Sequence, residues 1–277
     1  MSTPFAYLAL IVGTVAAVRS TWSPCGLSML STLTPVAERA KGHRYGATCA
    51  WFVMGATAGG LALGGLVAML AAVVAGLGPS SAAVGSVALA AALVALVSDT
   101  GLAGVRVPVH HRQVNERWLD TYRPWVYGGG FGFQIGTGLA TYITTAAVYL
   151  FVVLGALTGD PAIALALGAS FGLVRGLAVL LTRRVTDPVG LLGFHRRFAA
   201  LLPRAQRAAL AVVALVAVVS AVVAWPVSGV VAAGAVVVTA SARLAVRPGR
   251  RPGTPIPGGP TSRVQVPADP GASVPVA

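Results

Sequence analysis

Long apolar runs separated by short polar segments dominate the chain and predict an all-α membrane protein. A helix that crosses a bilayer needs about 20 mostly apolar residues, and seven runs can be drawn on that criterion. They extend over Phe5–Pro35, Gly46–Leu77, Ala82–Val97, Val126–Leu157, Pro161–Leu181, Ala208–Trp225 and Ser228–Ala242. The third and seventh runs are short, whereas the first, second and fourth are long enough for a tilted or interrupted helix. We therefore expect about seven transmembrane helices.

The positions of the basic residues support this count, because cytoplasmic loops of membrane proteins are enriched in Lys and Arg. Of the 20 Lys and Arg residues, 18 fall in the segments that follow the first, third, fifth and seventh runs. The segments on the opposite side hold none. This alternation predicts a multi-pass protein of the plasma (inner) membrane, with the N-terminus outside and the C-terminus in the cytoplasm. Contact with the lipid bilayer would then be a sufficient role for the basic loops.

The composition narrows the class of protein further. Of the 277 residues, 56% are hydrophobic and 10% are charged, whereas soluble domains carry about 25% charged residues. The net charge of +13 is spread over several loops instead of one face, so no nucleic-acid partner is expected. Two cysteines do not form a disulfide scaffold. From about Arg247 the chain is rich in Pro, Gly and Ser, which is typical of a disordered tail.

Two short matches between the halves of the chain suggest an internal repeat. Cys25-Gly-Leu-Ser28 aligns with Thr137-Gly-Leu-Ala140, and Gly55-Ala-Thr-Ala58 aligns with Gly168-Ala-Ser-Phe171, at offsets of 112 and 113 residues. Three spans in each copy would make the repeat inverted, a design that places functional sites near mid-membrane. We expect a 3+3 inverted-repeat core plus one extra helix. The segments are a first three-helix repeat (1–100), a second with basic cytoplasmic loops (101–226), a seventh span (227–245) and a disordered cytoplasmic tail (246–277).

The repeat also indicates where the long first and fourth runs are interrupted. Pro24 and Gly26 would break the first, and Gly136 and Gly138 would break the fourth. Proline removes a backbone donor and glycine loosens the helix. The freed backbone groups must then face protein or water, because lipid cannot satisfy them.

The first break carries a resemblance to a known family. Ser23-Pro24-Cys25, with the apolar run that follows it, and the glycine-rich Gly128–Gly136 resemble the CcdA/DsbD family of transmembrane thiol–disulfide (cytochrome c biogenesis) proteins, within the wider LysE-type transporter superfamily. The resemblance implies a six-span inverted-repeat core. It also implies thioredoxin-like partners and transfer of reducing equivalents across the membrane, with Cys25 as the catalytic, exchanging thiol.

The chain departs from that family at one position. The second cysteine of the family would fall near Thr137, where this sequence has threonine. Cys49 is the other cysteine, but its expected depth differs from that of Cys25 by roughly 10 Å along the helices. A disulfide needs Cα atoms within about 7 Å, so no bridge between Cys25 and Cys49 is expected.

Polar residues inside the apolar runs are candidates for a functional path, since charge in the membrane is costly. Arg19, Thr137, Thr141 and Arg175 are expected to line such a path. Arg19 could also lower the pKa of a nearby thiol, and Asp99 is the nearest candidate for an acidic partner. No metal site and no cofactor are expected, because His110-His111, Glu116 and Asp120 lie in a loop and lack a clear ligand spacing.

The resulting functional prediction is a CcdA-like membrane protein for thiol redox or maturation of extracytoplasmic proteins, with any enzyme activity being thiol–disulfide exchange. Because the second cysteine is missing, two alternatives stay open. One is a transporter or exporter of a small solute or ion on the same scaffold. The other is a non-catalytic membrane assembly factor.

Overall fold

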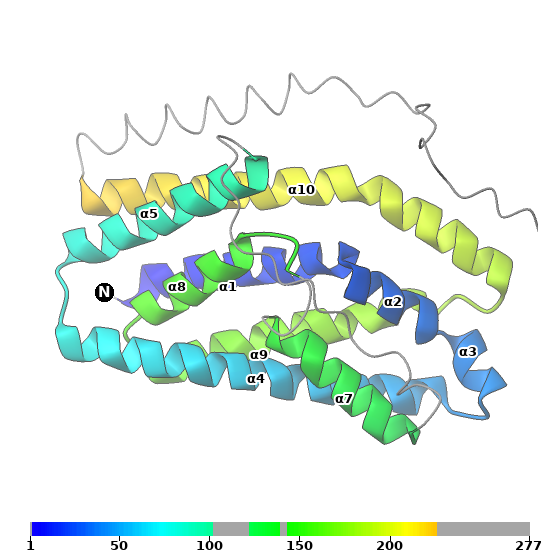
Figure 1. The fold of residues 1–277 in the computed structure, drawn as a ribbon. Helices are drawn as coiled ribbons and strands as arrows, with labels where there is room; N and C mark the ends of the chain where they lie inside the picture. Colours follow the sequence, from blue (N-terminus) through cyan, green and yellow to red (C-terminus); the bar gives the residue numbers. More distant parts are fainter. Residues whose placement is uncertain (1, 102–121, 139–142, 226–277) are drawn as a thin grey trace, which may run out of the picture.

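The computed structural model describes residues 2–101, 122–138 and 143–225, and within these ranges it contains helices and no strand. The helices run side by side in one elongated bundle (Figure 1). Five are long and apolar enough to cross a membrane, which is consistent with a membrane protein. They are α1 (Ser2–Arg19, continued by the 3₁₀ turn η1, Ser20–Trp22), α4 (Tyr45–Leu77), α5 (Ser81–Thr100), α9 (Pro161–Leu177, continued by η3, Ala178–Thr182) and α10 (Pro188–Ala224). The predicted seventh run, Ser228–Ala242, lies outside the described residues.

The first predicted run is interrupted as a helix. After η1 the backbone is extended at Ser23, with φ −70° and ψ 158°, and α2 (Pro24–Thr32) begins at the next residue. Proline suits the first turn of a helix because its missing N–H would have no partner there. The Ser23 hydroxyl accepts a hydrogen bond from Gly26 N at 3.1 Å and caps the helix. A short α3 (Pro35–Ala40) follows.

The fourth predicted run is also interrupted. It forms α7 (Pro124–Thr137) and α8 (Ala147–Leu157), which lie in different halves of the bundle (Figure 1). Gly138 ends α7 with φ +67°, a conformation that favours glycine. Both interruptions lie between the two ends of the bundle.

Helix α10 begins 20 residues before the predicted start at Ala208, so the predicted basic loop is in part helical. Asp187 caps the helix by accepting a hydrogen bond from Gly190 N at 2.7 Å, and Pro188 occupies the first turn. The apolar pattern could not reveal this half, because its arginines and exposed Leu192 do not form a bilayer-length apolar run.

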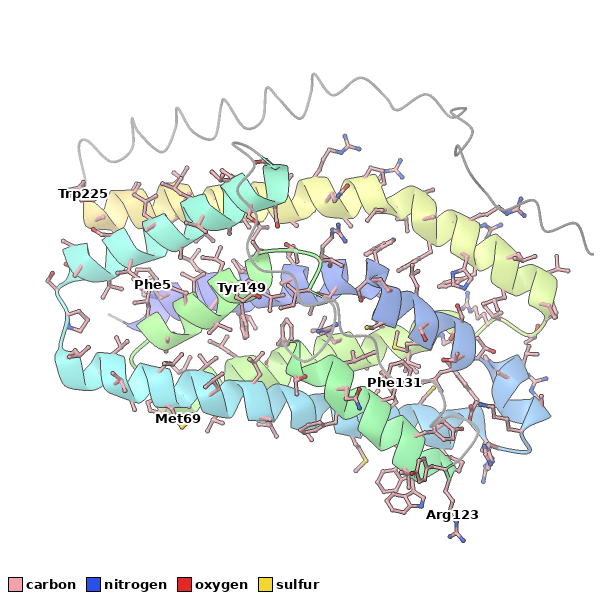
Figure 2. All side chains as sticks on the ribbon, viewed as in Figure 1. Phe5, Met69, Arg123, Phe131, Tyr149 and Trp225 are labelled. Carbon is pink, nitrogen blue, oxygen red and sulfur yellow. The ribbon has the colours of Figure 1, made fainter. Side chains whose placement is uncertain are left out.

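Glycine permits the close packing of α4 against α7 and α9. A side chain at Gly60 would collide with the backbone of Gly168 and Gly172, and one at Gly136 would collide with the backbone of Ala56. Small residues of this kind let membrane helices approach each other closely. On its outer face α4 exposes large apolar side chains, including Met69 at 63%, as expected for contact with lipid (Figure 2).

The charged segments gather at one end of the bundle, which we call the basic end. It contains the segment Arg39–Arg44, Arg123 and Arg183–Arg184. Figure 2 shows Arg123 at this end and Phe5 and Trp225 at the other. A hydrogen bond from the Thr182 hydroxyl to Leu33 O, at 3.1 Å, connects the residue before Arg183 to the end of α2.

Candidate functional site at the two helix breaks

Asp99, in the last turn of α5, connects the two interrupted spans. Its Oδ1 accepts a hydrogen bond from Ala146 N at 2.7 Å, and its Oδ2 accepts one from the Thr145 hydroxyl at 2.5 Å. A carboxylate is favourable there because the first N–H groups of α8 carry a partial positive charge. Asp99 also interacts electrostatically with Arg19, the half-buried last residue of α1. One carboxylate therefore joins the end of α1 to the start of α8.

Arg175, in the last turn of α9, lies between the other halves of the same two spans. Its side chain is 4% exposed, and its guanidinium carbon is 5.7 Å from the centre of the Phe171 ring. A Cβ atom at Gly138 would lie 3.4 Å from its Nη1 atom, which places the guanidinium against the end of α7. Arg175 also interacts electrostatically with Cys25, the second residue of α2. The guanidinium therefore lies against the second break and interacts electrostatically with a residue of the first.

The acidic residues of the described ranges all have partners other than Arg175. Asp99 interacts with Arg19, Thr145 and Ala146, as above. Asp160 and Asp187 cap α9 and α10 through backbone N–H groups. Glu38 accepts hydrogen bonds from Thr48 and Tyr127. Among the described residues, the electrostatic interaction of Arg175 is with Cys25 and not with a carboxylate.

Both cysteines are buried and neither forms a disulfide. Cys25 is 2% exposed and Cys49 is 4% exposed. Cys49 lies near the start of α4, beside Tyr45. Cys25 lies at the first break, where Gly26 fits closely against the backbone of Thr21.

The other predicted site residues differ in their surroundings. Pro24 starts α2, whereas Gly136 lies within α7, which continues to Thr137. The Thr137 hydroxyl donates to Gln134 O at 2.8 Å, a carbonyl of its own helix. Thr141 lies outside the described residues, and so do His110, His111, Glu116 and Asp120. The pathway role assigned to Arg19, Thr137, Thr141 and Arg175 stays a prediction.

A second buried polar group, which no sequence pattern indicated, is formed by five residues that we call the Glu38 cluster: Glu38, Thr48, Tyr127, His43 and Lys41. Glu38 is 0% exposed. The Thr48 hydroxyl lies 2.5 Å from its Oε2, and the Tyr127 hydroxyl lies 2.9 and 2.7 Å from its two oxygens. His43 Nδ1 is 3.3 Å from the same Tyr127 hydroxyl, and Lys41 Nζ is 5.5 Å from the Tyr127 ring centre. The cluster fastens α3 to α4 and α7 at the basic end.

Comparisons with known proteins give a consistent set of relatives. No family model and no solved structure matches the chain. Five curated proteins match, and all are named methylamine utilization protein MauF. The Paracoccus versutus protein is 35% identical over 184 residues, which are 63% of this chain and 65% of the relative. The Paracoccus denitrificans protein is 35% identical over 170 residues, 58% of each chain. The Methylorubrum extorquens protein is 29% identical over 173 residues, 61% of this chain and 60% of the relative.

These relatives overturn the functional prediction. Their shared name concerns methylamine utilization, so the identification with the CcdA/DsbD family, the thiol-redox function and the cytochrome c biogenesis and transport classes were wrong. The transporter and assembly-factor alternatives gain no support from the names. The misleading signal was Ser23-Pro24-Cys25, since a serine cap followed by proline starts α2 whatever the chemistry of the next residue. Because Cys25 was assigned as an exchanging thiol from that family alone, the reason for this assignment no longer holds.

The match is partial as well as consistent. The chain spans less than two thirds of the length of the first two relatives, and the shares for the five range from 58% to 69%. Over this shared part, the chain is similar to proteins of methylamine utilization.

Proposed function

We propose that the chain is a multi-span membrane protein that supports methylamine utilization. The observation that carries the proposal is the shared name of the five relatives, at 28–35% identity over 170–196 residues. The apolar helices agree with a role in the membrane.

The proposal includes the seven spans, the inverted repeat, the plasma-membrane location and the orientation expected from the sequence. Two observations support it. The two predicted interruptions fall in the first and fourth runs, as related repeats would require, at Ser23 and Gly138. The basic segments gather at one end of the bundle, which would face the cytoplasm.

The working part of the protein in this proposal is the polar region of Arg19, Asp99 and Arg175 at the two breaks. A charged side chain inside the membrane costs free energy. Such residues are therefore rare there, and they usually belong to functional sites. Asp99 bonds to the start of α8, Arg19 interacts electrostatically with Asp99, and Arg175 interacts electrostatically with Cys25 at the first break.

Deletion of the coding sequence in its own host tests the proposal. The deletion strain should fail to grow with methylamine as the sole carbon and nitrogen source and should grow normally on succinate with ammonium. A plasmid copy of the intact sequence should restore growth on methylamine. Normal growth of the deletion strain on methylamine would contradict the proposal.

A further inference from the structure

We propose that the first half of α10, residues 188–207, lies at the membrane surface and binds the headgroups of anionic phospholipids. The inference rests on the proposed function only in placing the bundle across a membrane, with its basic end at one surface. It adds a helix face and the kind of lipid that this face binds.

The length of α10 exceeds what a bilayer requires. The helix has 37 residues, which at 1.5 Å per residue extend over about 55 Å, whereas the hydrocarbon core is about 30 Å thick. The second half, 208–224, is almost entirely apolar and leads to Trp225, away from the basic end (Figure 2). The first half contains every arginine of the helix and therefore extends beyond the core at the basic end.

Helix α10 bends between its two halves. Figure 1 shows the first half turning toward the end of the bundle where α2 and α3 lie. Pro203 lies inside the helix, where it removes a backbone N–H and its ring disturbs the preceding turn. The first half therefore does not continue the line of the spanning half, as expected for a helix that leaves the core and follows the surface.

One face of this half is fastened to the first break. The Trp22 ring stacks on the Phe198 ring with 4.3 Å between centroids, and Trp22 Nε1 donates to Phe198 O at 2.9 Å. Phe194 stacks on Phe198 in turn, with 5.6 Å between centroids. His195 Nε2 lies 3.2 Å from the Ser31 hydroxyl of α2. These contacts fix which face of the helix points away from the bundle.

The outward surface combines large apolar side chains with positive charge. Val189 and Leu192 are 75% and 66% exposed. The same half exposes four arginines: Arg196, Arg197, Arg204 and Arg207. No Asp or Glu occurs in 188–224, and Asp187, just before the helix, accepts a hydrogen bond from Gly190 N. A basic helix that also exposes apolar side chains is typical of helices that lie in the membrane interface.

The charge of this surface decides which partner fits it. Arginine forms strong, charge-assisted hydrogen bonds with phosphate groups, and an anionic membrane surface attracts each nearby basic residue. Phospholipid headgroups are close at hand, because the apolar half of the same helix crosses the bilayer in this proposal. A second copy of the chain would bring like charges together and would be repelled. The surface therefore fits anionic phospholipid.

The test measures which lipid contacts this face in nanodiscs made of equal parts of phosphatidylglycerol and phosphatidylcholine. The full-length Ala200→Cys variant carries a fluorescent label at an exposed position of α10, while both native cysteines are buried. One lipid at a time has brominated acyl chains, which quench the label on contact. We expect phosphatidylglycerol beside the label at least ~5 times as often as phosphatidylcholine, the factor that one arginine at an anionic surface provides.

Two variants that each lose four positive charges identify the responsible surface. Replacing the four arginines of α10 by glutamine should abolish the preference for phosphatidylglycerol. The matched control replaces four exposed arginines of the basic end outside α10 by glutamine and should keep the preference: Arg39, Arg44, Arg183 and Arg184. Equal loss in the two variants would overturn the proposal, because the total charge of the basic end would then be sufficient.

Two further results would overturn the proposal even if the α10 variant does not fold. A preference that rests on charge weakens at high salt, so a wild-type preference unchanged by salt would contradict it. Quenching by neither lipid would show that the face points away from the membrane and is open to a protein partner instead. The assay is independent of growth, so a deletion strain that still grows on methylamine would refute the proposed function and leave the lipid preference standing.

Discussion

Replacing Tyr127 by phenylalanine would remove one hydrogen-bond donor from the buried carboxylate of Glu38 and keep the aromatic ring. Both side chains are 0% exposed, and the hydroxyl lies 2.9 and 2.7 Å from the two carboxylate oxygens. Water cannot replace the lost donor at such a site without opening the contact between α3 and α7.

The expected cost follows from leaving a buried acceptor without one of its donors. An unsatisfied buried acceptor costs about 1–3 kcal/mol, and the Thr48 hydroxyl, 2.5 Å from Oε2, stays in place. We therefore expect Tyr127→Phe to lower the free energy of unfolding by about 2 kcal/mol. For chains of this size the midpoint of thermal unfolding falls by about 2–4 °C per kcal/mol, which gives a decrease of about 4–8 °C.

The assay is thermal unfolding of the purified protein in detergent, followed by intrinsic tryptophan fluorescence. Tyr7→Phe is the matched control, because Tyr7 is 64% exposed and the same atom is removed. Thr48→Val removes the other donor, and the double variant should show coupling, since the two hydroxyls share one carboxylate. A midpoint for Tyr127→Phe within about 1 °C of the control, far below the expected decrease, would refute the role given to the Glu38 cluster.

Two further predictions concern the packing of α4 and the link between the breaks. Gly60→Leu should sharply reduce the yield of folded protein, because its side chain would collide with the α9 backbone, whereas Gly65→Leu, with open space around it, should be tolerated. Equal yields by size-exclusion chromatography would show that α4 and α9 do not pack as described. Asp99→Ala should lower stability by about 3 kcal/mol, because it leaves the Ala146 N–H without its partner. Asp187→Ala, at an exposed helix cap, should cost only about 1 kcal/mol, and the reverse order in thermal unfolding would contradict the account of the breaks.

The sequence predicts the described helices well where one simple rule governs the backbone. Apolar length locates α4, α5 and α9, and the break at Pro24 follows from its missing N–H. Gly138 ends α7 in a conformation that favours glycine, while the equally suspect Gly136 serves packing within the helix. Local sequence does not distinguish these two glycines, because the difference depends on the contact with α4.

The site residues show the same division. The cost of charge in a membrane makes Arg19 and Arg175 candidates from the sequence alone, and their role stays a prediction. The partners of Glu38 are 10 and 89 residues away, so no local pattern connects them. The functional prediction relied on Ser23-Pro24-Cys25, on the glycine-rich Gly128–Gly136 and on the suggested repeat, and the order of the first three residues is explained by the start of a helix.

We propose that this membrane protein supports methylamine utilization through the charged region at its helix breaks. The most direct measurement is the growth rate on methylamine of the deletion strain supplied with the wild-type sequence, Arg175→Gln or, as a control at an exposed arginine, Arg184→Gln, with equal amounts of protein in the membrane. We expect normal growth with the wild type and Arg184→Gln, and loss of growth with Arg175→Gln on methylamine but not on succinate with ammonium. Wild-type growth of the Arg175→Gln strain on methylamine would contradict the account.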